Sequence, residues 1–262
     1  MFQVKDLFSV KDKVVFITGG DQNIGMAVAK GFAENGAKVV IGNTSREKAE
    51  GIIRFMEDGG YDYLWVKTDI SKEEEIKAAF DAIMEKYGRI DVLFNNAAVR
   101  VNQMGLEHEA DSWDWIFDIN VRGTMLCSRE AARLMKAQGG GKIINTSSIS
   151  SVRGMVNRTS YCATKAAVNG YTAACAVEWS KYGIYVNAVA WGGVNVEETA
   201  YADMPAGMQE VVRMTPTEHL ANAEELYGAV AFLATDASNG MSGQVVFVDG
   251  GWSIAGKPQE IS

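Results

Sequence analysis

The sequence predicts an α/β protein with one doubly wound parallel sheet of about seven strands and helices on both faces. Short apolar runs alternate with longer stretches whose apolar residues have helical spacing, which is typical of βα units. The runs VVFIT and VVFV are apolar throughout, as expected of strands buried on both faces of a parallel sheet. With 262 residues, of which 47% are hydrophobic, the chain is long enough to bury one such core.

The expected elements follow from this alternation. Strands are predicted over residues 14–18, 38–42, 64–67, 92–95, 142–146, 185–189 and 245–248. Helices are predicted over residues 24–35, 46–58, 72–87, 111–136, 161–182 and 223–234. No stretch rich in proline and glycine divides the chain, so we predict one domain over residues 1–262. Residues 193–222 break the alternation, which predicts a lid over a site.

Charge and cysteine usage argue against several classes of partner. The 33 acidic residues outnumber the 25 basic ones, giving a net charge of −8, and no basic block occurs. Such a surface is unsuited to nucleic acid or to an anionic membrane. No apolar stretch is long enough to span a membrane, and the first residues lack the apolar core of a signal peptide. Three widely spaced cysteines suit a reducing compartment, so we expect a cytoplasmic protein.

A glycine-rich turn comes directly after the first predicted strand. The sequence GGDQNIG, residues 19–25, joins VVFIT to a helical stretch. In a Rossmann-type fold this turn lets a dinucleotide's pyrophosphate approach backbone N–H groups at a helix N-terminus. Gly19 and Gly25 suit the turn. Asn23 stands where a third glycine would be expected, and asparagine adopts positive φ more readily than most residues. A merely tight connection would have the same pattern.

A second motif lies in SYCATKAAVNGY. Tyr161 and Lys165 are four residues apart, so on a helix they share one face. A nearby ammonium stabilises a tyrosinate, and we expect it to lower the pKa of Tyr161 toward neutrality, which would make the tyrosine a usable general acid or base. The same spacing also occurs on solvated helix faces, and the companion motifs decide between the two interpretations.

The motifs together resemble those of the short-chain dehydrogenase/reductases. They occur in that family's order: TGGDQNIG at Thr18, NNAA at Asn95, DIN at Asn120, TSS at Thr146, YCATK at Tyr161 and VDGG at Val248. The likeness runs over residues 13–252 and is to the single-domain branch. It implies an NAD(P)(H)-dependent oxidoreductase that interconverts a small-molecule secondary alcohol and a ketone.

The resemblance implies a catalytic tetrad of Asn120, Ser148, Tyr161 and Lys165. Ser148 lies thirteen residues before Tyr161, as the family spacing requires, and Ser147 is the alternative. Ser148 would hydrogen-bond the substrate oxygen while Tyr161 transfers a proton and hydride passes to or from the nicotinamide. Lys165 would hold the ribose hydroxyls, and Asn120 would anchor a water that links the lysine to solvent.

The resemblance also implies a set of cofactor contacts. Asp69 would contact the adenine, although an aspartate at a strand end also fits an ordinary turn. Asn95 would steady the sheet beside the cofactor. The predicted cofactor-binding residues are Gly19, Asn23, Ile24, Gly25, Asn43, Thr44, Ser45, Arg46, Asp69, Ile70, Asn96, Ala97, Tyr161, Lys165, Gly192 and Val194.

The end of the second predicted strand bears on the choice of cofactor. NAD enzymes usually carry an acid there, but this chain has Asn43, and Thr44, Ser45 and Arg46 could hold a 2′-phosphate. Asp21 in the glycine-rich turn would repel that phosphate. On balance the sequence favours NADP(H) over NAD(H).

Two residues depart from the family pattern near the nicotinamide. Trp191 replaces a proline, and Val196 stands where a threonine is usual. The Val194 N–H could still contact the carboxamide, with Asn195 or Thr199 supplying the missing side-chain bond. These departures keep open a non-catalytic dinucleotide-binding regulator, and a lyase or epimerase on the same fold is a remoter alternative.

The residues expected around the substrate are Ser148, Met155, Tyr161, Trp191 and Tyr201. Their segments are mostly apolar and also contain four arginines that could bind a carboxylate: Arg100, Arg153, Arg158 and Arg213. A hydroxysteroid with an acidic side chain, like a bile acid, fits both features and is the preferred interpretation. A sugar acid such as a gluconate and a 3-oxoacyl thioester are the alternatives.

Neither histidine supports a metal site. His108 and His219 have no second ligand nearby in the sequence, so we predict no catalytic metal. Small residues such as Ala166 and Ala173 on the helix of Tyr161 permit close helix approach, and family members pair this helix across subunits. We therefore expect a homodimer or homotetramer.

Overall fold

Seven parallel strands form one sheet in the computed structural model, which describes residues 4–255. The strand order is β3-β2-β1-β4-β5-β6-β7, which confirms the predicted doubly wound α/β fold. The strands are β1 (Val14–Thr18), β2 (Lys38–Asn43), β3 (Tyr63–Lys67), β4 (Val92–Asn95), β5 (Gly141–Ser148), β6 (Ile184–Trp191) and β7 (Val245–Val248). From β1 the chain winds out to β3 and returns to β4 on the other side of β1. The carboxyl ends of β1 and β4 therefore border the crevice in which such folds bind ligands.

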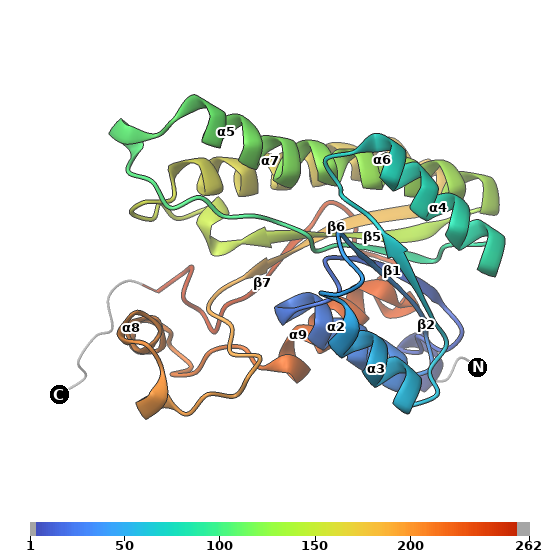
Figure 1. The fold of residues 1–262 in the computed structure, drawn as a ribbon, viewed down its shortest axis with the longest axis horizontal. Helices are drawn as coiled ribbons and strands as arrows, with labels where there is room; N and C mark the ends of the chain where they lie inside the picture. Colours follow the sequence, from blue (N-terminus) through green and yellow to red (C-terminus); the bar gives the residue numbers. More distant parts are fainter. Residues whose placement is uncertain (1–3, 256–262) are drawn as a thin grey trace.

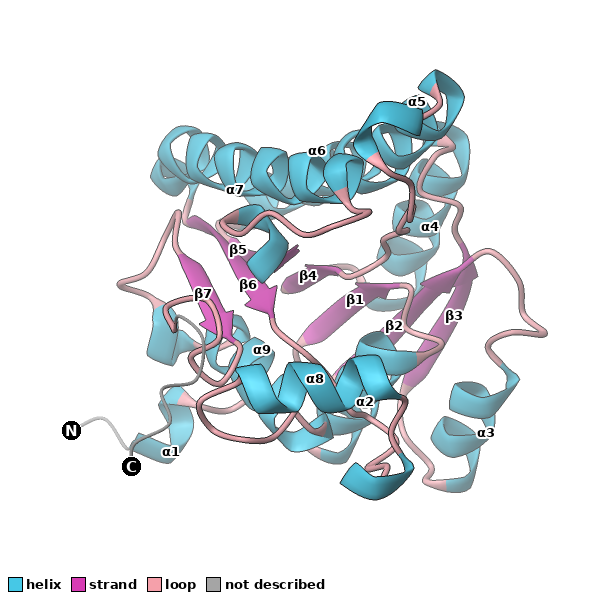
Figure 2. Cartoon of the chain, turned by 90° about the vertical axis from the view of Figure 1, so that its left-hand side faces the viewer, coloured by secondary structure: helices cyan, strands magenta, loops and turns pink. Residues whose placement is uncertain are grey.

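Helices cover both faces of this sheet (Figures 1 and 2). On one face lie α2 (Asn23–Glu34), α3 (Glu50–Asp58) and α9 (Ala223–Ala234). On the other lie α4 (Glu73–Tyr87), α5 (Ala110–Phe117), α6 (Thr124–Gln138) and α7 (Thr159–Trp179). The remaining α-helices of residues 4–255 are α1 (Val4–Leu7) and α8 (Ala206–Met214). Within that range no helix is long and apolar enough to cross a membrane.

The packing of β1 explains why its sequence is apolar throughout. Val15 and Ile17 belong to the core cluster that includes residues of α2, α3 and α9, whereas Val14 and Phe16 belong to the cluster that includes residues of α4 and α6. All four side chains are buried. Alternate residues of the strand thus enter opposite cores. This packing holds the carboxyl end of β1, which leads into the glycine-rich turn.

Two predicted helices have different boundaries in the structure. The helix expected from residue 46 begins at Glu50, because residues 46–49 form turns after Asn43, whose Nδ2 donates to Ser45 O over 2.8 Å. The helix expected over residues 111–136 is divided into α5 and α6 by a π-helical turn, Asp118–Gly123. The amide of Asn120 in that turn bonds to groups outside the helix, which explains the interruption.

Residues 193–222 contain a helix that the sequence did not predict, α8. The two ends of this segment are joined, since Asn195 N donates to Ala221 O over 2.9 Å and Ala221 N donates to Gly193 O over 3.0 Å. Figure 2 shows α8 beside the layer that contains α2. The segment is therefore an ordered excursion from the end of β6 that returns to the start of α9.

Candidate active site

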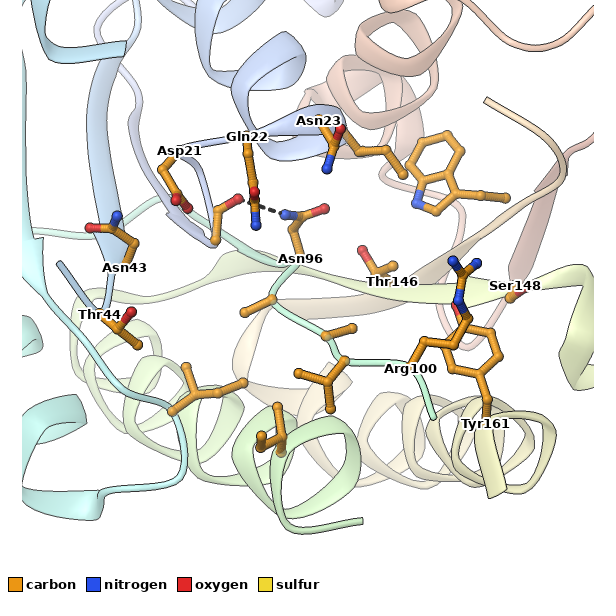
Figure 3. Close-up of a pocket in the computed structure, with 18 of the residues that line it drawn as sticks. Asp21, Gln22, Asn23, Asn43, Thr44, Asn96, Arg100, Thr146, Ser148 and Tyr161 are labelled. Carbon is orange, nitrogen blue, oxygen red and sulfur yellow. Dashed lines mark hydrogen bonds between the residues drawn. The ribbon is translucent and has the colours of Figure 1, made fainter. Parts of the chain in front are cut away.

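A cavity of about 620 Å³ lies at the carboxyl ends of the central strands (Figure 3). Most of the predicted cofactor residues line it: Gly19, Asn23, Ile24, Asn43, Thr44, Asp69, Ile70, Asn96, Ala97, Tyr161, Gly192 and Val194. Lining residues that the sequence did not single out for the cofactor include Gln22, Lys48, Thr68 and Thr146. We call the part formed by the turns after β1 and β2 the cofactor end, and the part around Ser148 and Tyr161 the substrate end.

The glycine-rich turn has the backbone that the sequence predicts. Gly19 has φ 64° and Asn23 has φ 46°, so asparagine does adopt the left-handed conformation here. Gly25 does not line the cavity but is required beneath it, because a Cβ at this position would lie 2.0 Å from Gly19 O. No side chain caps the start of α2, where Gln22 is the N-cap. Its first N–H groups are available to an anion in the cavity.

Asn96 joins this turn to the loop after β4. Its backbone N–H and that of Ala97 both donate to Thr18 Oγ1 over 3.1 Å, and its Nδ2 donates to Gly19 O over 2.9 Å, the dashed line in Figure 3. Two segments 77 residues apart in sequence are thereby held together. The floor of the cofactor end is built by the protein's own hydrogen bonds.

A second polar network lies beneath the substrate end. Asn95 Nδ2 donates to Asn145 Oδ1 over 2.9 Å and to Ser128 Oγ over 2.8 Å. Asn145 Nδ2 in turn donates to Thr172 Oγ1 over 2.9 Å. All four residues are buried, so these bonds satisfy groups that would otherwise be costly to desolvate. The network ties β4 and β5 to α6 and α7, which carries Tyr161, in keeping with the expected role of Asn95 in steadying the sheet.

The turn after β2 corrects two predicted cofactor contacts. Ser45 and Arg46 do not line the cavity, and the Arg46 guanidinium lies 5.5 Å from the centre of the Trp65 ring. Lys48 lines the cavity instead. Lys48 was not predicted, because a helix was expected from residue 46, whereas residues 46–49 are turns. Asn43 is held by Trp65, whose Nε1 donates to Asn43 Oδ1 over 2.7 Å.

Asp69 lines the cavity and also forms the strand-end turn considered as its alternative role. Its Oδ1 accepts from Ser71 N over 3.0 Å and from Ser71 Oγ over 2.7 Å. Burial raises the pKa of Asp69, but the Ser71 hydrogen bonds and the nearby Lys72 charge outweigh burial, so its pKa is below the ordinary value. The carboxylate is thus ionised at neutral pH, and an adenine contact stays a prediction.

Ser148 and Tyr161 meet at the substrate end. Both line the cavity, one from the end of β5 and the other from the first turn of α7. The neighbouring Ser147 Oγ donates to Asn169 Oδ1 over 2.6 Å and does not line the cavity. Successive residues of a strand point to opposite faces, so only one of the two serines can face the tyrosine. The geometry favours Ser148.

Lys165 lies close to Tyr161 but does not lower its pKa as expected. Burial raises the pKa of Tyr161, and the influences that lower it are Ser148, Arg100 and Arg158. The Lys165 Nζ donates to Thr146 O over 2.8 Å and lies 5.5 Å from the centre of the tyrosine ring. Burial lowers the pKa of Lys165 itself to about 7, so much of its charge is lost at neutral pH.

Asn120 is buried and holds a loop. Its Oδ1 accepts from Val99 N and its Nδ2 donates to Val99 O, both over 2.8 Å. Nδ2 also donates to Thr164 Oγ1 over 3.2 Å. Asn120 and Lys165 do not line the cavity, in contrast to Ser148 and Tyr161. The structure thus shows Asn120 positioning the segment before Arg100, and its predicted role in anchoring a water stays a prediction.

Comparison with known proteins identifies the family. A family model described as enoyl-(acyl carrier protein) reductase matches residues 19–253. The cis-4-hydroxycyclohexanecarboxylate dehydrogenase of Sinomonas cyclohexanicum is 39% identical over 251 residues, which cover 92% of this chain and 97% of that protein. The chain belongs to the short-chain dehydrogenase/reductase family. It is therefore an oxidoreductase that acts on CH–OH and C=O groups.

Other short-chain dehydrogenase/reductases resemble it nearly as closely. A 3beta-hydroxysteroid dehydrogenase of Mediterraneibacter gnavus is 33% identical over 92% of this chain and 95% of that protein. The crystal structure of a gluconate 5-dehydrogenase from Burkholderia cenocepacia, in complex with NADP and tartrate, superposes with a TM-score of 0.89 at 34% identity. That match covers 97% of this chain and all of the other. The relatives thus act on chemically different alcohols.

The cavity of this short-chain dehydrogenase/reductase fits a nicotinamide dinucleotide. The glycine-rich turn, of which Gly19 and residues 21–24 line the cavity, and the uncapped start of α2 would hold a pyrophosphate. Trp191, which replaces the family's proline, is buried and lines the cavity, and its Nε1 has no hydrogen-bond partner within residues 4–255. Asn195, considered for a nicotinamide contact, instead bonds to Thr199 N and O.

Two residues predicted to contact the substrate do not line the cavity in this structure. Met155 does not line the cavity, and its Sδ accepts from Ser150 Oγ over 3.3 Å. Tyr201 also lies outside the cavity and is 46% exposed, because residues 201–203 form a 3₁₀ turn at the surface. Spacing could not predict either outcome, since both residues lie in irregular segments. Ser148, Tyr161 and Trp191 do line the cavity.

The four candidate arginines separate into two pairs. Arg100 and Arg158 line the cavity at its substrate end. Arg153 donates through Nη1 to Trp252 O and to Ala255 O, and Arg213 pairs with Glu210. The structure therefore brings only the first pair to the site.

Proposed function

We propose that this chain is a dehydrogenase that prefers NADP(H) and interconverts a secondary alcohol and a ketone. The observation that carries the proposal is the meeting of the Ser148 and Tyr161 side chains at one end of a cavity whose other end is a glycine-rich turn at a helix N-terminus. A catalytic role for this pair explains why both groups face the cavity. It argues against the non-catalytic regulator, whereas a lyase or epimerase would be distinguished by a cofactor that is bound but not consumed.

In the proposed reaction Ser148 and Tyr161 both hydrogen-bond the substrate oxygen. On reduction the Tyr161 hydroxyl gives its proton to that oxygen; on oxidation the tyrosinate removes the proton from the alcohol. A bound nicotinamide supplies or accepts the hydride. The raised pKa of Tyr161 keeps the hydroxyl protonated at neutral pH, which suits its role as a proton donor. Lys165 would hold the nicotinamide ribose and, through the water at Asn120, connect the tyrosine to solvent.

The preference for NADP(H) is supported by the charges at the cofactor end. Asn43 supplies no carboxylate there, and Thr44 and Lys48 would bind a 2′-phosphate. Asp21 also lines this part and opposes the phosphate, so we expect a preference of modest size. The related gluconate 5-dehydrogenase was crystallised with NADP. Titration of intrinsic fluorescence with NADPH and NADH measures the two dissociation constants directly.

A hydroxysteroid is the second candidate substrate, after a small hydroxy acid. The 33% identity to a 3beta-hydroxysteroid dehydrogenase supports the steroid. A sugar acid or cyclic hydroxy acid is supported by a gluconate 5-dehydrogenase and by a hydroxycyclohexanecarboxylate dehydrogenase, at 34% and 39% identity. We place the small hydroxy acid first because two relatives of this kind stand closer than the steroid enzyme.

We further propose that residues 193–222 close over the substrate, since Val194 at their base lines the cavity and the two ends are tied together.

We propose a homodimer or homotetramer in which a second copy covers a surface groove beside the exposed Trp115. The groove is lined by Phe117, Val121, Met125 and Tyr171. Sedimentation of the purified protein measures the number of subunits in the assembly.

The three cysteines are free thiols, which supports a cytoplasmic enzyme.

The test is the absorbance at 340 nm of NADPH or NADH mixed with the protein and a panel of ketones. The panel contains 4-oxocyclohexanecarboxylate, 5-keto-D-gluconate, a 3-ketosteroid and a 3-oxoacyl thioester. We expect NADPH to be consumed with one of the two oxo acids. If no ketone is reduced while fluorescence shows bound NADPH, the dehydrogenase proposal is wrong and a regulator is the better interpretation.

A further inference from the structure

We propose that Arg100 and Arg158 form a carboxylate-binding pair, so that the substrate is a small oxo or hydroxy acid whose acid group binds near the catalytic tyrosine. This inference rests on the proposed function, because it takes Ser148 and Tyr161 as the groups that bind the substrate oxygen. It assigns the specificity of the reaction to two residues outside the family's motifs.

The two arginines come from loops that the structure ties together. Arg100 lies in the loop after β4, and Arg158 immediately precedes α7. A parallel β-bridge joins Gln103 to Arg158, and His108 Nε2 lies 2.7 Å from Ser160 Oγ. On the other side, Asn120 holds both backbone groups of Val99, next to Arg100. The backbone of each arginine is therefore fixed relative to the other by contacts that do not involve either guanidinium.

Neither guanidinium is neutralised by the part of the protein that the structure describes. Among residues 4–255, no salt bridge involves Arg100 or Arg158. Five of the other eight arginines of the same range pair with acids, namely Arg89, Arg122, Arg129, Arg133 and Arg213, whereas Arg46, Arg54 and Arg153 do not line the cavity. The chain carries a net charge of −8, so acids to pair with these two are not scarce. The acids that line the cavity, Asp21 and Asp69, come from the turns after β1 and β3, so the two cations at the substrate end create a site that attracts an anion.

The electrostatics of Arg158 support the same conclusion. Burial lowers its pKa, and the neighbouring charge of Arg100 lowers it further. Arg158 is partly buried and Arg100 is exposed, and a second positive charge beside the partly buried Arg158 is unfavourable unless an anion neutralises it. A carboxylate accepts from guanidinium groups through two oxygens, so one acid group can bind both side chains at once.

The position of the pair limits the size of the substrate. Figure 3 shows the Arg100 guanidinium beside the ring of Tyr161, and the charges of both arginines act on that tyrosine. One small substrate can therefore place its acid group at the arginines and its reacting oxygen at the tyrosine hydroxyl. Residues 97–99, which lead to Arg100 along the wall, are Ala, Ala and Val. An acid on an apolar ring fits this lining better than a polyhydroxy acid does.

The test compares an acid with its neutral ester. The probes are 4-oxocyclohexanecarboxylate and its methyl ester, with NADPH, for the wild type and for Arg100→Gln, Arg158→Gln and the double variant. We expect kcat/KM for the acid to fall about 10- to 100-fold in each single variant, mainly through KM, because each loses a charge-assisted hydrogen bond. For the ester we expect changes below about 3-fold. Arg158→Lys keeps the positive charge but lacks the planar guanidinium that can bind both carboxylate oxygens. It should retain part of the preference for the acid over the ester.

Arg133→Gln is the matched control, because it removes the same charge from an arginine of α6 that pairs with Glu130 outside the cavity lining. We expect it to leave both kcat/KM values unchanged. A different role for the pair has a different signature. If Arg100 and Arg158 acted only on the pKa of Tyr161, the variants would lower kcat for the acid and the ester alike, and the carboxylate proposal would be overturned.

A binding measurement separates this proposal from the dehydrogenase proposal. Calorimetry with the NADP⁺-saturated protein compares cyclohexanecarboxylate with cyclohexanecarboxamide. We expect the wild type to bind the carboxylate more tightly and the double variant to lose that preference. If no ketone is reduced but the arginine-dependent preference is present, the dehydrogenase proposal fails and the carboxylate site stands. If both ketones are reduced equally well and no preference is found, the site fails and the dehydrogenase stands.

Discussion

The two ends of the cavity are built differently. The cofactor end consists of short turns that leave buried strands, and Asn96 and Thr18 hold it with hydrogen bonds between segments far apart in sequence. The substrate end depends on longer loops after β4, β5 and β6, where Val152 and Val156 are 59% and 79% exposed. The contrast teaches that the core fixes what every reaction of the family shares, whereas the loops are free to set the substrate.

The substitution Tyr161→Phe should distinguish the functions of the two ends most strongly. Loss of the proton donor should lower kcat about 10²- to 10⁴-fold, while the dissociation constant of NADPH stays within about 3-fold because the cofactor end is untouched. Absorbance at 340 nm and fluorescence titration measure the two effects. Retained turnover would remove Tyr161 from the mechanism.

The converse change is Gly25→Ala at the cofactor end. A Cβ there would lie 2.0 Å from Gly19 O, so the glycine-rich turn must shift. We expect NADPH to bind about 5- to 100-fold more weakly, as for a strained packing site. Gly228→Ala in α9 is the control, because a Cβ at that position meets no atom within 4 Å, and it should bind NADPH normally. Equal affinities in both variants would show that the turn is not the pyrophosphate site.

Lys48→Glu tests which cation serves the cofactor end. Because Lys48 lines the cavity, we expect the affinity for NADPH relative to NADH to fall about 10-fold. Arg46→Glu should change this ratio by less than about 2-fold, since Arg46 lies against Trp65 outside the cavity. The opposite order of effects would restore Arg46 as the phosphate-binding residue.

Lys165→Met tests how much the buried amine of Lys165 lowers the free energy of unfolding. Burial lowers the pKa of Lys165 to about 7 from the ordinary 10.5, so between these values the unfolded chain binds more protons than the folded one. The free energy of unfolding therefore gains up to about 1.4 kcal/mol per pH unit as the pH rises through this window. Urea unfolding at several pH values should show a smaller rise for Lys165→Met.

Lys142→Met is the comparison for that experiment. Lys142 is also buried, with its pKa lowered to about 8, but it lies at the start of β5, away from the cavity. Its variant should lose the part of the rise that begins near pH 8 and keep its activity. If the pH dependence of Lys165→Met matches that of the wild type, the amine of Lys165 is charged in the folded protein.

The sequence predicted the sheet correctly, and most of the residues predicted at the cofactor end line the cavity, because local requirements determine these residues. VVFIT is apolar because both faces of β1 are buried, and Asn23 was identified from its tolerance of positive φ. Spacing also distinguished Ser148 from Ser147, in agreement with the hydrogen bond of Ser147 to Asn169.

The failures share a different cause, which is contact between distant segments. The bonds of Asn43 to Ser45 and Trp65 replace the expected helix start by turns and bring Lys48 into the cavity. The burial of Lys165 could not be inferred from its spacing to Tyr161. Likewise, nothing in the sequence distinguishes Arg158, which faces the cavity, from Arg153, which holds the backbone of residues 252 and 255.

The π-helical turn Asp118–Gly123 changes the helical register of the residues that follow it. The position of a loop at the substrate end depends on this change. Each residue added to a helix rotates the rest of that helix by about 100°. Deleting one residue of this turn would join α5 and α6 into an uninterrupted helix and rotate the amide of Asn120 away from Val99. The loop that leads to Arg100 would lose its anchor although no residue of the cavity had been changed. Small insertions or deletions in a helix beneath the site would thus change the selectivity for the substrate.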